Sequence, residues 1–399
     1  MKTREVKLGE VANVKGGKRI PKGIGLINIP NGHPYIRVRD LNNKRLLELD
    51  NSYEYVDNET QKVISKYTVK TGDVVLSIVG TIGLVAIVGR TLDGANLTEN
   101  CVKLSSFHGV NRDFLYYYLR SDCGQQEIRC GTVGAVQAKL PIKNIQNIAI
   151  NLPDYTTQER IASLLLSIDR KIELNQKIND NLEQQAVTYF QELYINNANP
   201  MWQISTISDL GTVVGGSTPS KTKPEYYTNN GIAWITPKDL SINKSKFISH
   251  GENDITDLGL KNSSATVMPK GTVLFSSRAP IGYIAIASNE VTTNQGFKSV
   301  VPYLEIGTAF VYFFLKHSLP VIESAASGST FKEISGSAMK NIPAIIPDRS
   351  TLDQFNSFCA PIFAQQKILE EQNHSLAMLR DSLLPKLMSG AIDIASIQL

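Results

Sequence analysis

A heptad register over residues 158–193 constrains this chain more than any other feature. At alternating spacings of four and three residues the register places Ile161, Leu165, Ile168, Ile172, Asn175, Asn179, Leu182, Ala186, Tyr189 and Leu193 on one seam. The segment holds neither Gly nor Pro, and as a helix it would be roughly 55 Å long. Such a seam is what a helix paired with another helix requires, and two polar Asn positions in it would fix the register. A long amphipathic core helix is the alternative interpretation.

A second helix is predicted over residues 352–384 and offers a partner for the first. The residues that share one of its faces are Phe355, Cys359, Ile362, Gln366, Leu369, Asn373, Leu376, Leu379 and Leu383. Gln366 and Asn373 are polar positions that could face Asn175 and Asn179. We therefore predict that the two helices pack antiparallel as a coiled coil, with a seam that comprises Ile161, Leu165, Ile168, Ile172, Asn175, Asn179, Leu182, Ile362, Leu369, Asn373, Leu376 and Leu383.

Prolines make the second helical pattern less regular than the first. Pro361 is expected to kink or start the helix, because proline lacks a backbone N–H and its ring crowds the preceding turn. The spacing also breaks between Leu376 and Leu379. The chain is then expected to turn at Pro385 and Gly390.

The chain is a tandem duplication of about 195–199 residues. The segment YIRVRDL (35–41) matches AWITPKDL (233–240), and KTGDVVLSIVGTIGLVAIVG (70–89) matches PKGTVLFSSRAPIGYIAIAS (269–288). Further on, FLYYYLR (114–120) matches FVYFFLK (310–316), and NIAINLPD (147–154) matches NIPAIIPD (341–348). The offset between the copies drifts from 199 to 194 residues, which is typical of small insertions and deletions within one ancient unit.

Each copy predicts a mixed α+β globular part. Its β-branched and apolar runs are separated by a Gly turn, as VVLSIVG is from GLVAIVG in the first copy and TVLFSS from GYIAIAS in the second, and the aromatic segment at 114–120 predicts a short helix or buried segment. The predicted fold is α+β, with two pseudo-repeated globular domains joined by two long antiparallel coiled-coil helices. The predicted segments are a first globular domain (1–157), a first spacer helix (158–195), a second globular domain (196–351), and a second spacer helix with the C-terminal tail (352–399).

Composition excludes several classes of protein. The chain has 399 residues, of which 42% are hydrophobic and 20% charged, and it holds no apolar run of membrane-spanning length. Its first residues, MKTREVKLGE, lack the apolar region of a signal peptide, so we expect a cytoplasmic protein. The four cysteines and five histidines show no metal-ligand spacing, so we expect reduced thiols and no metal site.

Positive charge is concentrated at the front of the chain. Residues 1–199 hold 25 basic and 21 acidic side chains, whereas residues 200–399 hold 16 of each. The stretch KGGKRIPK (15–22) has four cations and two glycines in eight residues. Such a loop could follow a phosphate backbone, although a solvated surface loop fits this stretch alone equally well.

No catalytic signature survives inspection. The phosphate-binding pattern fails because Ala12 stands where the first glycine should be, and GIGLIN (23–28) has Asn28 in place of its third glycine. The sequence contains no [DN]PP[YF], GxSxG or HExxH motif. A nuclease-like set of Asp154, Asp169 and Lys171 is conceivable, but we interpret the last two as part of a solvated helix face. We therefore expect no catalytic residues in this chain.

Polar and cationic residues recur near glycine-rich turns at matching places in the two copies. Arg and Lys can read guanine edges, and Asn and Gln can pair with adenine. Taken singly each could be an ordinary surface group, but their recurrence favours DNA binding for the group. The predicted DNA-binding residues are Lys18, Arg19, Arg37, Arg39, Asn100, Gln137 and Lys139 in the first copy, and Lys223, Lys238, Arg278, Asn294, Gln295, Lys298 and Lys332 in the second.

The duplication, the helices and several local strings together resemble the specificity subunits of type I restriction–modification systems. The strings are QERIASLLLSIDRKIELNQK (158–177) after NLPD, SSRAPIGYIAI (276–286), TNQGFKSV (293–300) and LRDSLLPKLMSG (379–390). The resemblance covers essentially the whole chain, and the combination of strings is specific.

The resemblance implies a non-catalytic DNA-reading subunit. Two target recognition domains would each read one half of a split, asymmetric sequence in double-stranded DNA, and the paired helices would set the spacer between the halves. The expected partners are two modification (methyltransferase) subunits and the restriction subunits, with no membrane. No cofactor is expected on this chain, whereas S-adenosylmethionine and ATP are expected on the partner subunits.

Two other classes of function remain open. The chain could be a coiled-coil scaffold with no DNA role, which the near-neutral second half favours and the repeated cationic turns disfavour. It could also be a fragment of a fused methyltransferase–nuclease, which the missing catalytic motifs disfavour. Recognition loops vary so widely within the family that no base contact is carried over to a residue of this chain.

Overall fold

The computed structural model describes residues 2–41, 44–328 and 332–394, so the predicted segments that start at residue 1 and end at residue 399 extend beyond the described residues. The chain forms two compact units. Unit 1 comprises Met1–Ile172 and Ser375–Leu399, and unit 2 comprises Glu173–His374. Each unit therefore contains one globular part together with a stretch of both long helices.

Unit 1 is built on a five-stranded sheet of order β2-β9-β6-β7-β4, a three-stranded sheet of order β5-β3-β8 and the pair β1-β10. Its strands are β1 Thr3–Lys7, β2 Asn13–Gly16, β3 Pro34–Ile36, β4 Leu46–Leu47, β5 Glu54–Tyr55, β6 Val74–Ser77, β7 Val85–Val88, β8 Asn96–Leu97, β9 Cys101–Ser105 and β10 Ala149–Pro153. Its shorter helices are α1 Leu8–Val11, α2 Asn58–Ile64, α3 Arg112–Arg120, α4 Asp122–Gly131 and α5 Ile142–Gln146. Every residue of β6 and β7 is buried, which explains why both strands are apolar except for Ser77 at the end of β6.

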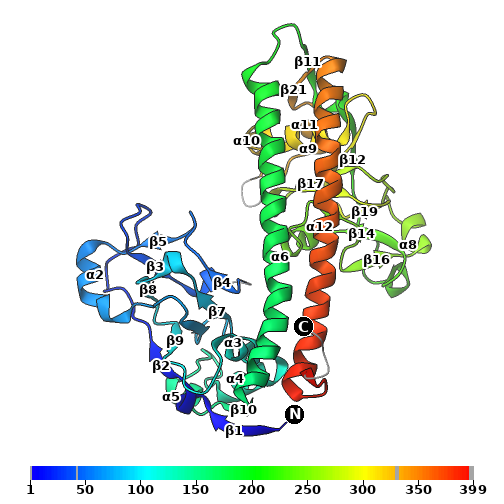
Figure 1. Cartoon of the computed structure of the whole chain (residues 1–399). Helices are drawn as coiled ribbons and strands as arrows, with labels where there is room; N and C mark the ends of the chain where they lie inside the picture. Colours follow the sequence, from blue (N-terminus) through cyan, green and yellow to red (C-terminus); the bar gives the residue numbers. More distant parts are fainter. Residues whose placement is uncertain (1, 42–43, 329–331, 395–399) are drawn as a thin grey trace. The chain divides into compact units, whose positions relative to one another are not determined.

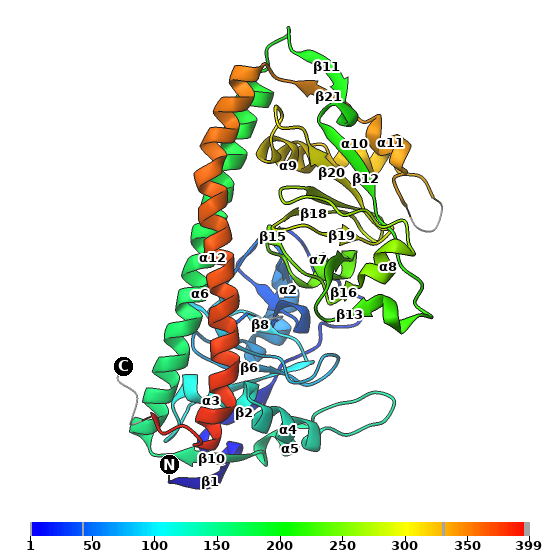
Figure 2. The ribbon, with the colours of Figure 1, turned by 90° about the vertical axis from the view of Figure 1, so that its right-hand side faces the viewer.

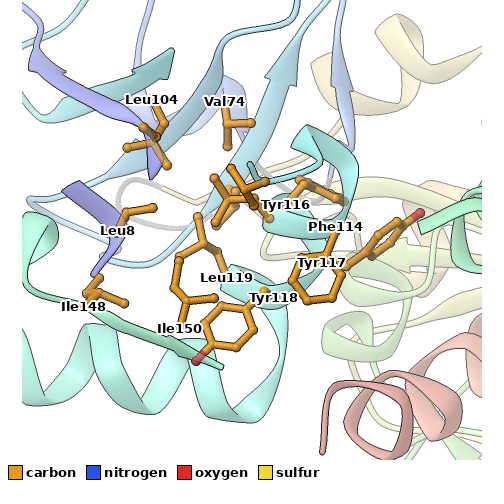
Figure 3. Close-up of a cluster of buried hydrophobic side chains, with 14 of the residues drawn as sticks. Leu8, Val74, Leu104, Phe114, Tyr116, Tyr117, Tyr118, Leu119, Ile148 and Ile150 are labelled. Carbon is orange, nitrogen blue, oxygen red and sulfur yellow. The ribbon is translucent and has the colours of Figure 1, made fainter. Parts of the chain in front are cut away.

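The aromatic segment of the first copy is helix α3, as predicted. Asn111 caps this helix, because its side-chain oxygen accepts hydrogen bonds from the backbone N–H groups of Asp113 (3.0 Å) and Phe114 (3.1 Å). The six residues from Phe114 to Leu119 are all buried. Figure 3 shows the aromatic side chains of α3 beside apolar side chains of the strands, including Val74 and Leu104. The helix is thus the centre of the unit 1 core.

Unit 2 repeats this plan with sheets of order β12-β20-β17-β18-β15, β13-β16-β14-β19 and β11-β21. Its strands are β11 Gln203–Thr206, β12 Gly211–Gly215, β13 Tyr227–Thr228, β14 Ile232–Ile235, β15 Phe247–Ile248, β16 Asn253–Ile255, β17 Val273–Ser277, β18 Ile281–Ala287, β19 Thr292–Thr293, β20 Lys298–Pro302 and β21 Pro343–Ile346. Its shorter helices are α7 Pro237–Ile242, α8 Asp257–Lys261, α9 Thr308–His317, α10 Leu319–Ser324 and α11 Gly336–Lys340.

Matched serines show that the two globular parts are copies in detail. In unit 1 the Ser77 hydroxyl accepts a hydrogen bond from the Leu84 backbone N–H at 2.9 Å. In unit 2 the Ser276 hydroxyl accepts from the Tyr283 backbone N–H at 2.7 Å. Both serines and both donors are related by an offset of 199 residues. The predicted duplication is therefore confirmed in sheet order and in individual hydrogen bonds.

The two long helices are α6, Tyr155–Phe190, and α12, Arg349–Ser389. A π-helical turn, Gln191–Asn196, continues α6. The prediction for Pro385 was wrong, because α12 continues past this residue. Helix α12 also does not start at Pro361, so of the two alternatives for Pro361 only a kink stays a prediction. Pro361 has no backbone N–H to donate to the carbonyl four residues earlier in the helix. Because Pro361 is exposed, that carbonyl can accept a hydrogen bond from water instead. After Pro385 the helix continues because Leu387 and Met388 are buried in the unit 1 core.

Within each unit the two helices pack antiparallel. In unit 2 the Asn175 side chain donates to Asn373 Oδ1 at 2.9 Å, and further along α6 the carbonyl of Asn179 accepts from Gln366 Nε2 at 3.1 Å. Partners on α12 thus run backwards as α6 runs forwards, and α6 and α12 lie side by side in both views (Figures 1 and 2). The predicted pairing of polar positions is confirmed, and so is the α+β fold with a long antiparallel helix pair.

The predicted seam residues occupy covered positions on the two helices. Those that are buried are Ile161, Leu165, Ile168, Asn175, Asn179, Ile362 and Leu369. Those that are half-buried are Ile172, Leu182, Asn373, Leu376 and Leu383. Burial of Asn175 and Asn179 leaves the Oδ1 atom of each without a hydrogen-bond partner among the described residues, which is the destabilising side of a polar layer.

Candidate nucleic-acid interface

Five loops of unit 1 meet where its strands end, and they are called loop set 1. They are residues 17–19, 36–40, 78–80, 98–100 and 132–140. Backbone hydrogen bonds join neighbouring loops: Lys18 N to Leu97 O (2.8 Å), Thr98 N to Ile36 O (3.1 Å), Ile78 N to Asn100 O (2.8 Å) and Leu140 N to Ile78 O (3.0 Å). Loops that are far apart in sequence therefore form one connected surface.

Unit 2 has a corresponding loop set 2. It comprises residues 216–218, 235–239, 277–280 and 293–296, together with 327–328 and 332–334. The counterpart hydrogen bonds are Ser217 N to Thr293 O (2.9 Å), Asn294 N to Ile235 O (3.0 Å), Ser277 N to Gly296 O (2.7 Å) and Ile334 N to Ser277 O (3.1 Å). Each bond corresponds to one in loop set 1 at the sequence offsets of the duplication, so one framework is used twice.

Glycine is required where the first loop of each set crosses its neighbour. A Cβ atom on Gly17 would overlap the carbonyl oxygens of Leu97 and Thr98, and one on Gly216 would overlap those of Thr293 and Asn294. Glycine at these two positions thus reflects close backbone approach, not flexibility.

The structure brings most of the predicted DNA-binding residues together. Loop set 1 carries those of the first copy, namely Lys18, Arg19, Arg37, Arg39, Asn100, Gln137 and Lys139. Loop set 2 carries Lys238, Arg278, Asn294, Gln295 and Lys332, and Lys298 begins the adjoining strand β20. Lys223 lies apart from these bonded loops, just before the 3₁₀ turn Pro224–Tyr226. That any of these residues contacts DNA stays a prediction.

Several predicted cations of loop set 1 are paired with carboxylates that the sequence reading missed. Arg19 Nε lies 2.6 Å from Glu99 Oε1, and Arg39 NH2 lies 2.7 Å from Glu54 Oε2. Arg37 also forms an ion pair with Glu54. Although partial burial favours the neutral acid, the hydrogen bond from Arg19 holds the pKa of Glu99 below its ordinary value. Only strand register places Glu54 beside these arginines, through the pairing of β5 with β3.

Loop set 2 shows the same chemistry with different residues. Glu333 receives two cations, with Arg278 NH1 at 3.2 Å from Oε2 and Lys298 Nζ at 3.6 Å from Oε1. Lys238 Nζ lies 2.6 Å from Glu252 Oε2. The pairing neutralises part of the charge that the sequence alone attributes to this surface.

Four predicted cations have no ion pair among the described residues. They are Lys18, Lys139, Lys223 and Lys332, and all four are exposed. Lys18 Nζ lies 5.6 Å from the centre of the Tyr67 ring, and Lys223 Nζ lies 5.3 Å from that of Tyr226. These are the groups best able to neutralise phosphates, because no carboxylate competes for them.

The predicted amide side chains differ in whether the amide oxygen already accepts a hydrogen bond within the protein. Asn294 Oδ1 accepts the Gly296 backbone N–H at 2.9 Å, and the Gln295 oxygen accepts the Thr218 hydroxyl. Bidentate pairing with adenine needs both the oxygen and the nitrogen of an amide, so these two are engaged by the framework. Gln137 is exposed on loop set 1 and is better placed for such pairing.

The residues of the nuclease-like alternative do not form a site. Asp154 caps helix α6, since its Oδ1 accepts the Thr157 backbone N–H at 3.0 Å. The solvated-face interpretation was wrong for Asp169, which is buried and accepts hydrogen bonds from Tyr117 Oη (2.6 Å) and Arg380 NH1 (2.8 Å). Lys171, two residues on, is exposed as expected. Within residues 2–41, 44–328 and 332–394 no His, Cys, Asp or Glu cluster could hold a metal ion.

Comparison with known proteins matches this chain to one family. A family model described as the type I restriction modification DNA specificity domain matches residues 2–184 and 199–372. The type I restriction enzyme MjaIX specificity subunit of Methanocaldococcus jannaschii is 38% identical over 193 residues, an alignment that spans 46% of this chain and only 44% of that relative. The HindI specificity subunit of Haemophilus influenzae is 23% identical over 67% of this chain and 73% of its own length.

A solved structure has a similar fold. The S subunit of a type I restriction-modification system from M. genitalium aligns with a TM-score of 0.56 at 17% identity, covering 97% of this chain and 99% of its own. In the described part of this chain, no helix is long and apolar enough to cross a membrane. Because the two matched regions fall on the two copies and together cover most of the sequence, the chain belongs to the family of type I restriction modification DNA specificity domains.

Proposed function

We propose that this chain is the non-catalytic DNA specificity subunit of a type I restriction–modification enzyme. Loop set 1 reads one half of a bipartite target in double-stranded DNA, and loop set 2 reads the other half. One observation carries the proposal beyond family membership: the same framework of loop hydrogen bonds occurs twice with different side chains on it. The bridged positions Val79 and Lys139 of loop set 1 correspond to Arg278 and Glu333 of loop set 2. Different chemistry on one framework suits an asymmetric target.

The distribution of ion pairs supports a division of labour on each surface. The unpaired lysines would hold the phosphate backbone, which gives affinity and register without sequence information. The paired arginines have orientations set by carboxylates, which suits directional contacts to base edges. Pairing also lowers the net positive charge, so non-specific binding to phosphates is weaker than the cation count suggests.

The remaining roles follow from this assignment. The long helices set the spacer between the two half-sites and dock two modification (methyltransferase) subunits, with restriction subunits joining to form the cleaving complex. S-adenosylmethionine and ATP bind those partners, and this chain holds no cofactor. We place the assembly in the cytoplasm, where it meets DNA. A coiled-coil scaffold with no DNA role has no comparable support, because the family matches both copies as DNA specificity domains.

Methylation mapping tests the proposal. The chain is co-expressed with its modification subunit, and methylated adenines are mapped across the genome by single-molecule sequencing. We expect a split motif that disappears when the chain is deleted. A modification subunit that is active with another specificity chain, yet yields no motif that depends on this one, would reject the proposal in favour of the scaffold.

Salt dependence gives a second test with a matched pair of variants. Lys332→Ala removes an exposed cation of loop set 2 that has no ion pair among the described residues, and should lower the slope of log affinity against log salt by about 1. Lys62→Ala removes an exposed lysine of α2 that is paired with Glu59 and should leave the slope unchanged. Equal slopes for the two variants would contradict phosphate binding by loop set 2.

A further inference from the structure

Lys246 is a buried lysine at the edge of the main sheet of unit 2. It directly precedes β15, the edge strand that pairs with β18. Its carbonyl accepts the Ile286 backbone N–H at 2.7 Å, so its backbone belongs to the sheet. Its side chain is only 6% exposed. A lysine is rarely buried without a specific partner, so the contacts of Lys246 indicate its role in the structure.

The ammonium group of Lys246 reaches both long helices. It forms an ion pair with Glu183 of α6. It also lies 2.6 Å from Oε1 of Gln366 on α12. Gln366 in turn donates to the carbonyl of Asn179 on α6 at 3.1 Å. One side chain from the sheet thus joins the two helices at the layer where they are linked to each other.

Further contacts fix the direction of this side chain. Lys246 Nζ lies 4.2 Å from the centre of the Phe363 ring and 4.9 Å from that of Tyr312, both within the range of cation–π attraction. The backbone N–H groups of Lys246 and Phe247 donate to the two carboxylate oxygens of Glu370 on α12, at 2.8 and 3.1 Å. The sheet edge is therefore held to α12 by backbone and by side chain.

The charges of this cluster balance. Lys246 and Lys316 face Glu183 and Glu370, and Lys316 Nζ lies 2.6 Å from Glu183 Oε1. Burial lowers the pKa of Lys246, while Glu183 opposes that shift and supports the charged form. A buried, balanced ion pair adds little net stability compared with apolar packing, but it specifies one geometry. This cluster is therefore better suited to fixing an orientation than to raising stability.

The orientation of the sheet at Lys246 affects the loops at the other end of strand β18, which pairs with β15. Strand β18 begins at Ile281, next to loop 277–280 of loop set 2, and reaches β15 at Ile286. Five residues of strand span about 17 Å, so a rotation of about 10° at the Lys246 end would move the loops by roughly 3 Å. Hydrogen bonds to base edges tolerate only a few tenths of an ångström.

We propose that Lys246 is a positioning residue for DNA recognition, because it fixes the second recognition sheet on the helix pair through Glu183, Gln366 and Glu370. The inference rests on the proposed function and deepens it. Without the Lys246 charge, unit 2 still folds and the helices still pair, but loop set 2 samples several angles. Reading of its half-site then weakens, while reading by loop set 1 persists.

The test uses Lys246→Met in the complete chain assembled with its modification subunits. Met keeps the apolar length of the side chain but removes its charge. Base preferences are measured at every position of both half-sites from genome-wide methylation. We expect preference to fall by about tenfold or more at the positions of one half-site and the other half-site to be unchanged. The control is Lys244→Met, an exposed lysine of the same loop that packs on the Tyr283 ring at 4.4 Å and touches neither helix through a described contact. It should leave both half-sites unchanged.

A corresponding variant in unit 1 shows which half-site each unit reads. Tyr117→Phe removes the contact of α3 with Asp169 in unit 1 and should relax the half-site that Lys246→Met leaves intact. Glu370→Gln keeps the Lys246 ion pair and provides a milder change if Lys246→Met does not fold. It should relax the same half-site to a smaller extent.

The outcomes separate the inference from the function on which it rests. A uniform decrease in methylation, with preferences at both half-sites retained, would mean that Lys246 serves stability alone and would overturn the inference. Unchanged preferences would overturn it as well. If the wild-type chain directs no motif, the proposed function itself fails.

Discussion

Asp169 gives a sharp test of how the helix pair is held in unit 1. Its side chain is 6% exposed and accepts hydrogen bonds from Tyr117 Oη at 2.6 Å and Arg380 NH1 at 2.8 Å. Removing one partner of a buried ion pair typically costs about 3–5 kcal/mol. Arg380 is 17% exposed and keeps Asp381 at 2.8 Å, so we expect the lower end of that range. Asp169→Ala should therefore lower the free energy of unfolding of unit 1 by about 3 kcal/mol.

Asp169→Asn should have a smaller effect than Asp169→Ala. It keeps an acceptor for the Tyr117 hydroxyl but loses the charge that faces Arg380. We expect a decrease in the free energy of unfolding of about 1.5 kcal/mol, the contribution of a hydrogen bond to a charged group. The free energy of unfolding of unit 1 should thus increase from Asp169→Ala to Asp169→Asn to the wild type.

Hydrogen exchange of α3 and urea unfolding would measure these effects. Both tryptophans of the chain, Trp202 and Trp234, belong to unit 2, so Trp fluorescence serves as an internal reference for unit 2. Arg170→Ala, the exposed neighbour, is the matched control and should remain within about 0.5 kcal/mol of wild type. If Asp169→Ala changed the unfolding of unit 1 by no more than this control does, the reasoning from burial would be refuted.

Three further changes test other parts of the structure. Gly17→Ala should destabilise unit 1 by about 2 kcal/mol, because its Cβ would overlap neighbouring carbonyls, whereas Gly25→Ala, with open space around it, should be neutral in thermal unfolding. Asn175→Leu combined with Asn373→Leu should raise the free energy of unfolding measured in urea by about 1 kcal/mol, because the pair of changes removes a buried Asn175 Oδ1 that has no partner among the described residues together with both ends of the hydrogen bond between the two side chains. A hydrogen bond from Lys44, supported by Ser52, holds the pKa of Asp50 at about 2. The stability that Asp50 contributes is therefore complete above about pH 4 and is lost as the pH falls towards 2, so acid titration of Asp50→Asn should show a smaller loss of stability across that window.

Much of the framework could be predicted from the sequence, because it depends on local patterns. The heptad seam predicted a helix over residues 158–193, and α6 spans Tyr155–Phe190 with a π-helical continuation. The Gly-separated apolar runs predicted strands such as β6 and β7, and the structure shows that these two strands pair antiparallel. Periodicity and turn residues act over a few positions, so they can be read without the fold.

The sequence predicted which loops form the candidate interface, but it did not predict which of their charged side chains form ion pairs. Comparison of the two copies located the loops, because a duplicated turn keeps its glycines. It did not show that Arg19 meets Glu99, 80 positions later in the chain, or that Arg278 meets Glu333. Such pairs depend on strand register and loop packing, which no local pattern encodes.

The sequence by itself determined the duplication, the α+β class, the two long helices and the family. Only the tertiary structure decided which charged groups are available. In the folded chain Asp169 is buried between Tyr117 and Arg380, and Lys246 is buried where it forms an ion pair with Glu183 of α6. The tertiary structure also kept α12 helical through Pro361 and Pro385. The physical reason is that burial and ion pairing join residues from distant segments, and their combined energy outweighs the local preference of a single residue.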